Sequence, residues 1–246
     1  MNLVVDTHTH TVSSGHSYST IQENAKEAVA NGIKMINMAD HAPGMIGAPC
    51  LYHFSNMRVI PEYIYGVRII KGVELNILNY QGEVDLPVSY MKRLELCLAS
   101  FHDICIAPST VEDHTNAAIA VLKNPFIDIL AHAGNPQFQL DNEKVVLAAK
   151  EHNKLIEINN HSFEARAGSD KNCYEIATLC KKHGVRMVTG SDAHISFSIG
   201  KFDKVKELLS RADIPEYLVL TSSCEKMESY LEERQKRIRD VVLSKG

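Results

Sequence analysis

Leu3-Val4-Val5-Asp6-Thr7-His8-Thr9-His10 is the stretch that decides the fold of this chain. A short apolar run, typical of a buried strand, is followed at once by side chains that bind metals. Similar runs recur along the chain, each ending in polar side chains: 35–38 before Asp40-His41, 67–73 before Glu74, 96–101 before His102, 127–131 before His132, 155–156 before Glu157, and 187–189 before Asp192 and His194. Ligands at the C-terminal ends of successive parallel strands are the pattern of a barrel active site.

Segments that carry helix start and stop signals separate these runs. Thr20 to Glu23 form a capping-box pattern, and Asn31-Gly32 would close the helix that it opens. Further helices are expected over 141–152, over 169–184 with Ser169 as the cap, over 202–211, and in a charged surface tail over 227–242. Strands that alternate with helices imply a parallel sheet. Because ligands come from seven strands rather than one switch point, a closed α/β barrel is favoured over an open sheet.

The bulk properties fit one such domain over residues 1–246, since α/β barrels run to about 250 residues. The run at 218–220 is a weaker candidate for an eighth strand. A net charge of −4 argues against a non-specific grip on long nucleic acids. No apolar run approaches the ~18 residues of a membrane span. Six cysteines without a C-x-x-C pair, and a start without a signal-peptide pattern, lead us to expect a cytoplasmic protein.

The candidate ligands are more numerous than one metal ion requires. His8 and His10, two residues apart in an extended segment, point to the same side. The full set is His8, His10, His16, His41, Glu74, His102, His132, Asp192 and His194. Zinc takes about four ligands, so the set suits two or three ions with one carboxylate as a bridge.

The charge of this set of candidate ligands limits the classes of substrate and reaction that the site would favour. Glu74 and Asp192 are its only acidic members, and neutral imidazoles do not offset the charge of divalent cations. A cluster that stays strongly positive favours a phosphate dianion and stabilises the charge of a phosphoryl transition state.

Several motifs, taken in order, resemble those of the PHP (polymerase and histidinol phosphatase) superfamily, and within it the YcdX-like phosphatases. These are the D-x-H-x-H start at 6–10, the Asp40-His41 pair, the strand end at 72–74 and the segment 190–194. The resemblance covers nearly the whole chain. It implies a distorted TIM-like (β/α)7 barrel, phosphoesterase activity, and a trinuclear site of divalent ions, zinc first, with manganese or iron as alternatives.

The resemblance also distributes the ligands. His8, His10, Glu74 and Asp192 would hold the first ion, Glu74 with His102 and His132 the second, and His16, His41 and His194 the third. Glu74, Asp192 and His194 are the residues expected to be catalytic through these ions. A hydroxide that bridges two ions would attack phosphorus, without a protein nucleophile.

Two residues outside the ligand set receive roles. Asp6 is expected to accept a hydrogen bond from a ligand histidine and to fix its tautomer. Arg166 is expected to bind the substrate phosphate, beside a helix start. His161 is expected in a solvent-facing loop and His53 at the rim. Cys180 and Arg186 satisfy C-x5-R, but in the reverse structural order to that of cysteine phosphatases.

The leading interpretation is a metal-dependent phosphatase of small phosphomonoesters. A phosphodiesterase or nuclease acting on nucleotides or short oligonucleotides would use the same ligands, and an amidohydrolase also starts with H-x-H. A metal-stabilised binding module would be expected to lack several ligands, and this chain keeps all nine. The physiological substrate, the metal, the preference for monoesters or diesters, the general acid and the oligomeric state are not determined by these patterns.

Overall fold

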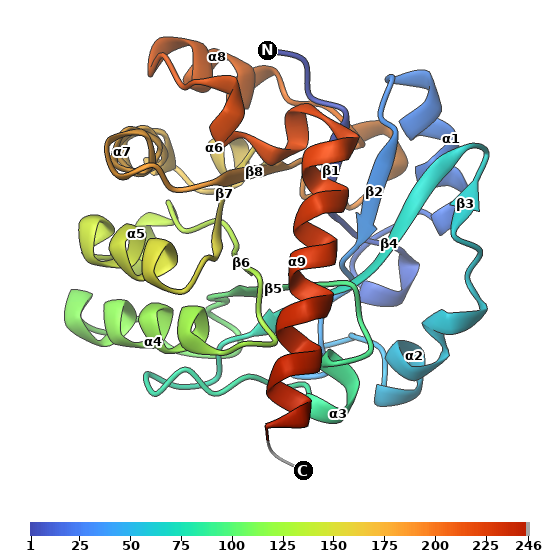
Figure 1. Ribbon diagram of the computed structural model, residues 1–246, viewed down its shortest axis with the longest axis horizontal. Helices are drawn as coiled ribbons and strands as arrows, with labels where there is room; N and C mark the ends of the chain where they lie inside the picture. Colours follow the sequence, from blue (N-terminus) through green and yellow to red (C-terminus); the bar gives the residue numbers. More distant parts are fainter. Residues whose placement is uncertain (245–246) are drawn as a thin grey trace.

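Seven parallel strands form the sheet, in the order β1-β2-β4-β5-β6-β7-β8, in the computed structural model of residues 1–244 (Figure 1). The last two residues of the predicted domain lie outside the described residues. The strands are β1 (Val5–Thr9), β2 (Met35–Met38), β4 (Val67–Asn76), β5 (Leu96–Ser100), β6 (Ile129–Leu130), β7 (Leu155–Asn159) and β8 (Met187–Gly190). The short β3 (Tyr63–Ile64) pairs with β4 in an antiparallel hairpin. The mixed α/β class predicted from the sequence is confirmed.

The barrel is nearly closed between β8 and β1. At the C-terminal ends of these strands, Thr9 pairs with Ala193 in a single parallel bridge, and the Asp192 amide donates to the His8 carbonyl over 2.9 Å. At the opposite ends, Val219 bridges to Met187. The predicted eighth strand at 218–220 is wrong: η5 (Glu216–Leu218) and η6 (Leu220–Ser222) turn there instead. The result is the distorted, TIM-like barrel of seven strands.

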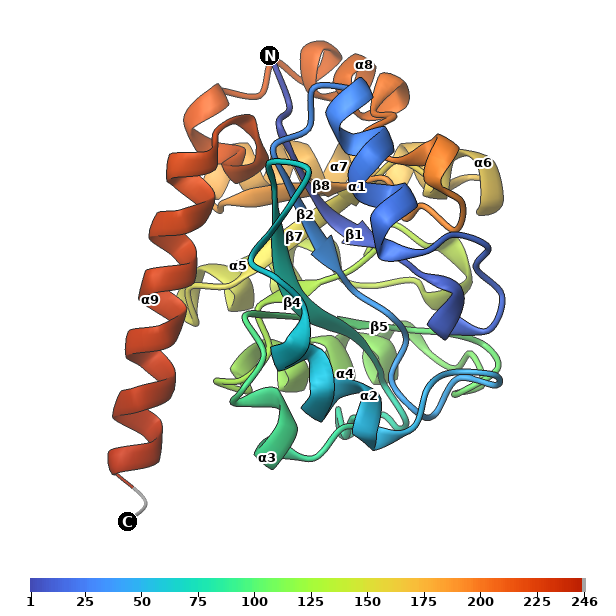
Figure 2. The same ribbon diagram turned by 90° about the vertical axis from the view of Figure 1, so that its right-hand side faces the viewer.

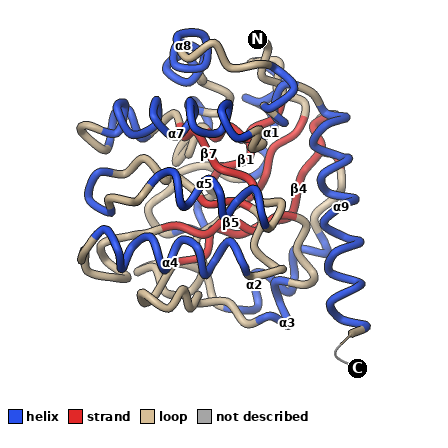
Figure 3. Tube along the Cα trace, turned by 60° about the vertical axis from the view of Figure 1, so that its left-hand side comes forward, coloured by secondary structure: helices blue, strands red, loops and turns tan. Residues whose placement is uncertain are grey.

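Helices surround the sheet (Figure 3), and those predicted from the sequence are among them. They are α1 (Ile21–Ala30), α2 (Leu51–Asn56), α3 (Val88–Met91), α4 (Val111–Lys123), α5 (Asn142–Glu151), α6 (Ser162–Ala165), α7 (Ser169–His183), α8 (Asp203–Arg211) and α9 (Cys224–Leu243). Four further 3-10 turns are η1 (Val12–Ser14), η2 (Met57–Val59), η3 (Pro136–Phe138) and η4 (Ser196–Ser198). Within residues 1–244, no helix has both the length and the apolar character of a membrane span.

The helix caps test the sequence signals in detail. The capping box between Thr20 and Glu23 is formed, and the Asp141 carboxylate accepts the Lys144 amide at the start of α5. Ser169 is not the cap that was predicted for α7, because its hydroxyl donates to the Ser162 carbonyl over 2.7 Å. Gly168, in a left-handed conformation, precedes that helix instead.

The interior of the barrel is apolar toward the N-terminal ends of the strands, and α9 closes that end. Met227, Tyr230 and Leu231 of α9 belong to one buried cluster with inward-facing strand residues such as Ile70 and Val188. Figure 2 shows α9 standing along one side of the strands. The tail predicted as a surface helix is therefore partly buried, and the candidate metal ligands lie at the other end of the strands.

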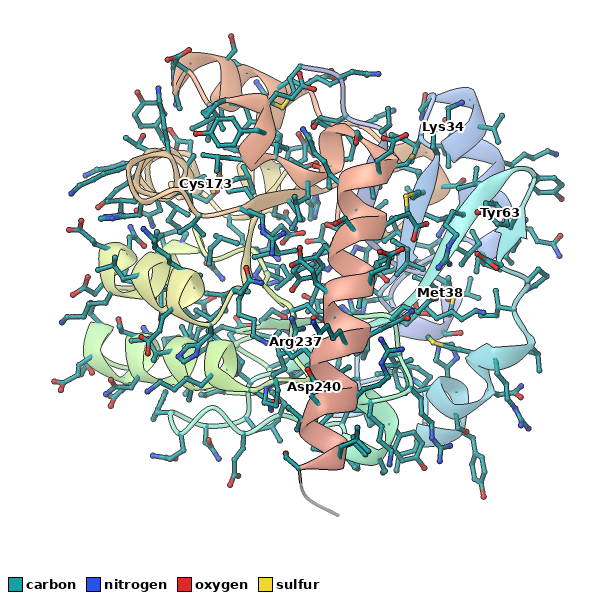
Figure 4. The ribbon with its side chains drawn as sticks, viewed as in Figure 1. Lys34, Met38, Tyr63, Cys173, Arg237 and Asp240 are labelled. Atoms are coloured by element: carbon teal, nitrogen blue, oxygen red, sulfur yellow. The ribbon has the colours of Figure 1, made fainter. Side chains whose placement is uncertain are left out.

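A buried ion pair fixes α9 to the barrel. The Arg234 guanidinium, 1% exposed, donates to the Asp128 carboxylate over 2.6 Å and to the Leu94 carbonyl. Arg237, labelled on α9 in Figure 4, makes a second contact with Asp128. The Asp128 carboxylate also accepts the Cys97 amide, so α9 is tied to the start of β5.

Arg234→Ala is expected to lower the free energy of unfolding by about 3 kcal/mol, because it leaves Asp128 buried without its main partner. Urea unfolding followed by circular dichroism measures the change. Arg239→Ala is the matched control, since Arg239 is exposed on the same helix. Equal midpoints for the two variants would contradict the anchoring role.

Candidate metal centre

The carboxylate of Glu74, 1% exposed at the end of β4, is the point on which the predicted ligands converge. Its Oε2 atom lies 2.8 Å from His41 Nδ1, 3.3 Å from His8 Nε2 and 3.5 Å from His10 Nε2. Its Oε1 atom lies 3.0 Å from His132 Nε2. These ligand atoms come from four different strand ends, as the sequence pattern predicted.

His102, after β5, completes the surroundings of Glu74. Its Nε2 atom lies 3.4 Å from Glu74 Oε1, and its Nδ1 atom lies 2.7 Å from the amide oxygen of Asn76. The Ser100 hydroxyl donates to Glu74 Oε1 over 2.7 Å. Both Ser100 and His102 face inward because side chains alternate along a strand.

Asp192 and His194, after β8, form the other side of the cluster. Asp192 Oδ1 lies 3.2 Å from His10 Nε2 and 3.6 Å from His8 Nε2. His194 Nε2 lies 3.1 Å from Nε2 of His16, which comes from the loop after β1. All nine predicted ligands are thus brought together at one end of the barrel.

Unpaired buried atoms also indicate that these residues fit divalent metals, and this evidence does not depend on the spacing of the residues in the sequence. Among residues 1–244, several buried ring and carboxylate atoms make no hydrogen bond even though they face one another: His8 Nε2, His10 Nε2, His41 Nδ1 and Glu74 Oε2. Buried polar atoms without partners are rare in native proteins. Three sets of ligand atoms lie within 4.8 Å of one another: His8, His10 and Glu74; His41, Glu74 and His102; and His10, His41 and His194. Cations between these atoms would satisfy them.

The protonation states of the two carboxylates, Glu74 and Asp192, suit metal binding. Burial raises the pKa of Glu74, but the nearby His8, His41 and His102 outweigh burial and hold that pKa well below its usual range. The pKa of Asp192 is also held well below its usual range, because His8 and His10 oppose the effect of burial. Both carboxylates are therefore ionised and can act as ligands.

Most of the imidazoles are favoured in the neutral form. Burial, reinforced by positive neighbours, lowers the pKa of His10 to about 3 and that of His132 to about 4. Burial also lowers the pKa of His16 and His194. His8 differs: burial lowers its pKa, but the surrounding carboxylates outweigh burial and raise it. At His8, a metal ion would take the place of the proton.

Two of the predicted ligands have an unusual backbone conformation. His132 has φ of 32° and Asp192 has φ of 55°, in the left-handed region that L-residues rarely adopt. The Asp192 amide is held by the His8 carbonyl, and the His132 amide donates to Glu157 Oε2 over 2.8 Å. Such strain persists where the surroundings fix the backbone, and it clusters at functional sites.

Glu157 on β7 is a supporting residue to which the sequence analysis gave no role. Its Oε1 atom lies 2.8 Å from His8 Nδ1, so it orients the ring whose Nε2 atom faces Glu74. Gly190 makes room for this contact, since a Cβ there would lie 2.2 Å from Glu157 Oε1. The signal was present, because Glu157 is an acidic residue at the end of a predicted strand.

Asp40 supports the neighbouring ring through Ser14. The Ser14 hydroxyl lies 3.1 Å from His10 Nδ1 and donates to Asp40 Oδ1 over 2.7 Å. His53 Nε2 lies 3.3 Å from Asp40 Oδ2, so His53 contacts this support as well as the rim. A sequence pattern cannot show these contacts, because the residues lie on three separate segments.

Asp6 does not have the role that was predicted. Its carboxylate accepts backbone amides, from Ser191 over 2.9 Å, from Gly200 over 3.0 Å and from His8 over 3.3 Å. Burial raises the pKa of Asp6 to about 6 despite these hydrogen bonds. Asp6 thus joins β1 to the segments after β8, and the ring of His8 is oriented by Glu157.

A cavity of about 320 Å³ opens above the ligands. Arg166 and His161 line it together with Met45 and ligands that include Glu74 and His194. The solvent-facing loop position predicted for His161 is wrong, because its ring centroid lies 6.3 Å from that of His194. Arg166 lies at the wall, where its Nη1 donates to the Ser162 hydroxyl over 3.0 Å and its Nη2 lies 3.5 Å from Asp192 Oδ2.

Comparison with known proteins gives the family. The PHP domain family matches residues 6–245. A protein of Acetivibrio thermocellus named probable phosphatase is 61% identical over 97% of this chain and 99% of its own length. A probable phosphatase of Clostridium novyi is 46% identical over 99% of this chain and 100% of its own length. The chain therefore belongs to the PHP domain family.

A solved structure agrees on the fold. The histidinol phosphate phosphatase of Lactococcus lactis, complexed with zinc, L-histidinol and phosphate, superposes with a TM-score of 0.63. The match covers 87% of this chain and 95% of that one, at 17% sequence identity. At this identity the likeness supports the barrel fold.

Glu157→Ala is expected to weaken metal binding by about 10- to 100-fold, because the His8 ring loses the partner that orients it. Competition with a chelator during zinc titration measures the affinity. Glu151→Ala, an exposed glutamate at the end of α5, is the control and should bind like the wild type. Unchanged affinity in Glu157→Ala would show that His8 needs no such support.

Proposed function

We propose that this PHP-family phosphatase hydrolyses small phosphomonoesters at a trinuclear centre of divalent ions, with zinc as the first candidate and manganese or iron as alternatives. The observation that carries the proposal is the convergence of seven histidines and two ionised carboxylates at one end of the barrel, with buried polar atoms left without hydrogen bonds among the described residues. The proposed sets are His8, His10, Glu74 and Asp192 for one ion, Glu74, His102 and His132 for the second, and His16, His41 and His194 for the third.

The balance of charge selects the chemistry. Two carboxylates do not neutralise three divalent cations, so the occupied site stays strongly positive and favours a phosphate dianion over a neutral amide. Such ions lower the pKa of bound water, which makes hydroxide available near neutral pH, and they offset the charge that develops on a phosphoryl group.

The protein's own residues position the ester. Arg166, the residue after α6, faces the cavity, and the Ser162 hydroxyl and Asp192 carboxylate hold its guanidinium at the wall. A guanidinium matches two phosphate oxygens at once, so Arg166 would orient the phosphoryl group over Glu74 and Asp192. Glu157 and Ser14 keep the rings of His8 and His10 directed at the same point.

The size of the cavity supports a small substrate. About 320 Å³ lies at the lower end of the range for small-molecule sites. Arg166 is the one arginine or lysine among the described residues that line it. A phosphodiesterase that follows a nucleic-acid strand would need a longer basic or stacking surface. The zinc and phosphate of the Lactococcus lactis relative are consistent with the same chemistry.

Glu74→Ala is expected to lower kcat/KM for p-nitrophenyl phosphate by more than about 100-fold, because it removes a ligand that two ions share. Elemental analysis of the same sample should find fewer ions than in the wild type. Cys180→Ser should keep full activity, since this thiol is buried away from the centre. Full metal content with near-normal turnover in Glu74→Ala would refute the bridging role.

The same assay decides between the two ester classes. The wild type should cleave p-nitrophenyl phosphate in preference to bis(p-nitrophenyl) phosphate, because the positive site favours a dianion over the monoanion of a diester. Preference for the diester would move the proposal to a phosphodiesterase. Metal-loaded protein that cleaves neither ester would refute both.

Arg166→Ala is expected to reduce kcat/KM for the monoester by about 10- to 100-fold, the effect of losing a charge-assisted hydrogen bond of roughly 1.5–3 kcal/mol. Metal content should stay at the wild-type value, since Arg166 is not a ligand. Arg211→Ala, an exposed arginine at the end of α8, is the control. A parallel loss of metal would show that Arg166 acts by holding Asp192 instead of substrate.

A further inference from the structure

A second cavity, of about 1050 Å³, lies beside α2 and the turn η2, outside the metal centre. It exists because the helical layer is thin at this place. The helices next to β4 are short, six residues in α2 and four in α3, whereas α7 has fifteen. Figure 2 shows the short helices α2 and α3 below β4.

The floor of this cavity carries an unexpected charge. Ile69, Lys71 and Val73 share the outward face of β4, because alternate residues of a strand point the same way. Ile69 and Val73 are fully buried, but the half-buried Lys71 lines the cavity. A lysine on the outer face of a central barrel strand, where apolar residues are the rule, calls for an anionic partner.

Two further cations reach the same cavity from other elements. Arg58 comes from η2 and Arg93 from the segment after α3. Among residues 1–244, no carboxylate forms an ion pair with Arg58, Lys71 or Arg93. The one acid that lines the cavity, Glu95, is already engaged, by Arg68 over 2.5 Å and by the Lys71 amide over 2.9 Å. The cavity is therefore lined by three cations, of which Arg58 and Arg93 are exposed, and none of the three forms an ion pair among the described residues.

The remaining walls suit a compact organic ligand. Tyr52, 81% exposed, and His53 offer flat rings at the edge of the cavity. His53 also contacts Asp40, so the cavity borders on the support of the metal centre without including any of its ligands. Its volume is that of a large small-molecule site.

We propose that this cavity binds a small molecule that carries several clustered oxyanion groups, such as a polyphosphorylated metabolite, at a site separate from the metal centre. Three cations on three elements match several anionic groups better than one, and they explain a lysine on the outer face of β4. The half-buried position of Lys71 makes its interaction with an anion stronger than that of an exposed lysine.

Isothermal titration calorimetry with myo-inositol hexasulfate tests the proposal on the metal-loaded protein. Sulfate esters are not substrates of a phosphatase, and they bind divalent cations more weakly than phosphates do. We expect one molecule per chain, with an affinity that falls as salt is raised. The double variant Lys71→Ala/Arg93→Ala should bind at least tenfold more weakly than the wild type.

Matched variants separate this site from the alternatives. Lys92→Ala removes an exposed lysine next to Arg93 but outside the cavity lining, and it should bind like the wild type. Arg166→Ala, at the metal centre, should also leave binding unchanged. Arg58→Ala lies on an exposed turn and covers the case in which the double variant does not fold. Absence of binding by the wild type, equal loss in Lys92→Ala, or loss only in Arg166→Ala would overturn the proposal.

Discussion

The buried carboxylate of Glu74 is the constraint on which the rest of the site depends. An ionised carboxylate that is 1% exposed is stable only with polar or positive partners close by, and five histidine nitrogens lie within 3.5 Å of its two oxygens. Those nitrogens come from four segments of the chain, and Glu74 itself lies on a fifth. The barrel must therefore bring the ends of β1, β2, β4, β5 and β6 to one point. The near-closure between β1 and β8 then adds Asp192 and His194 at the same end.

A layer of polar residues makes this arrangement rigid. Glu157 holds the His8 ring and the His132 amide, Asn76 holds the His102 ring, and Ser14 joins the His10 ring to Asp40. The contacts to the rings of His8, His102 and His10 fix which ring nitrogen faces the centre. Further down the same strands the inward positions become apolar, and α9 closes the barrel there through Met227, Tyr230 and the pair of Arg234 with Asp128. The apolar core and the candidate metal centre thus lie at opposite ends of one barrel.

The incomplete helical layer is the second consequence of this architecture. Connections of six and four helical residues beside β4 are enough to complete the sheet, but they cover its outer face only in part: Ile69 and Val73 are buried, whereas Lys71 is half-buried. In a barrel with full-length helices, the position of Lys71 would be apolar and sealed. The cationic cavity exists because that cover is missing.

The sequence by itself determined the seven strands, the α/β class and the nine candidate ligands, because a candidate ligand at the end of an apolar run depends only on local order along the chain. The caps at Thr20 and Asp141 were also predictable, since the hydrogen bonds span three residues. Contacts between distant segments were decided only by the tertiary structure. The closeness of Glu157 to His8, the backbone role of Asp6, the position of His161 in the cavity and the turns in place of an eighth strand all depend on packing across the barrel. The spacing of apolar residues along the sequence predicts which way a side chain faces. Which distant residue it contacts depends on the three-dimensional path of the chain.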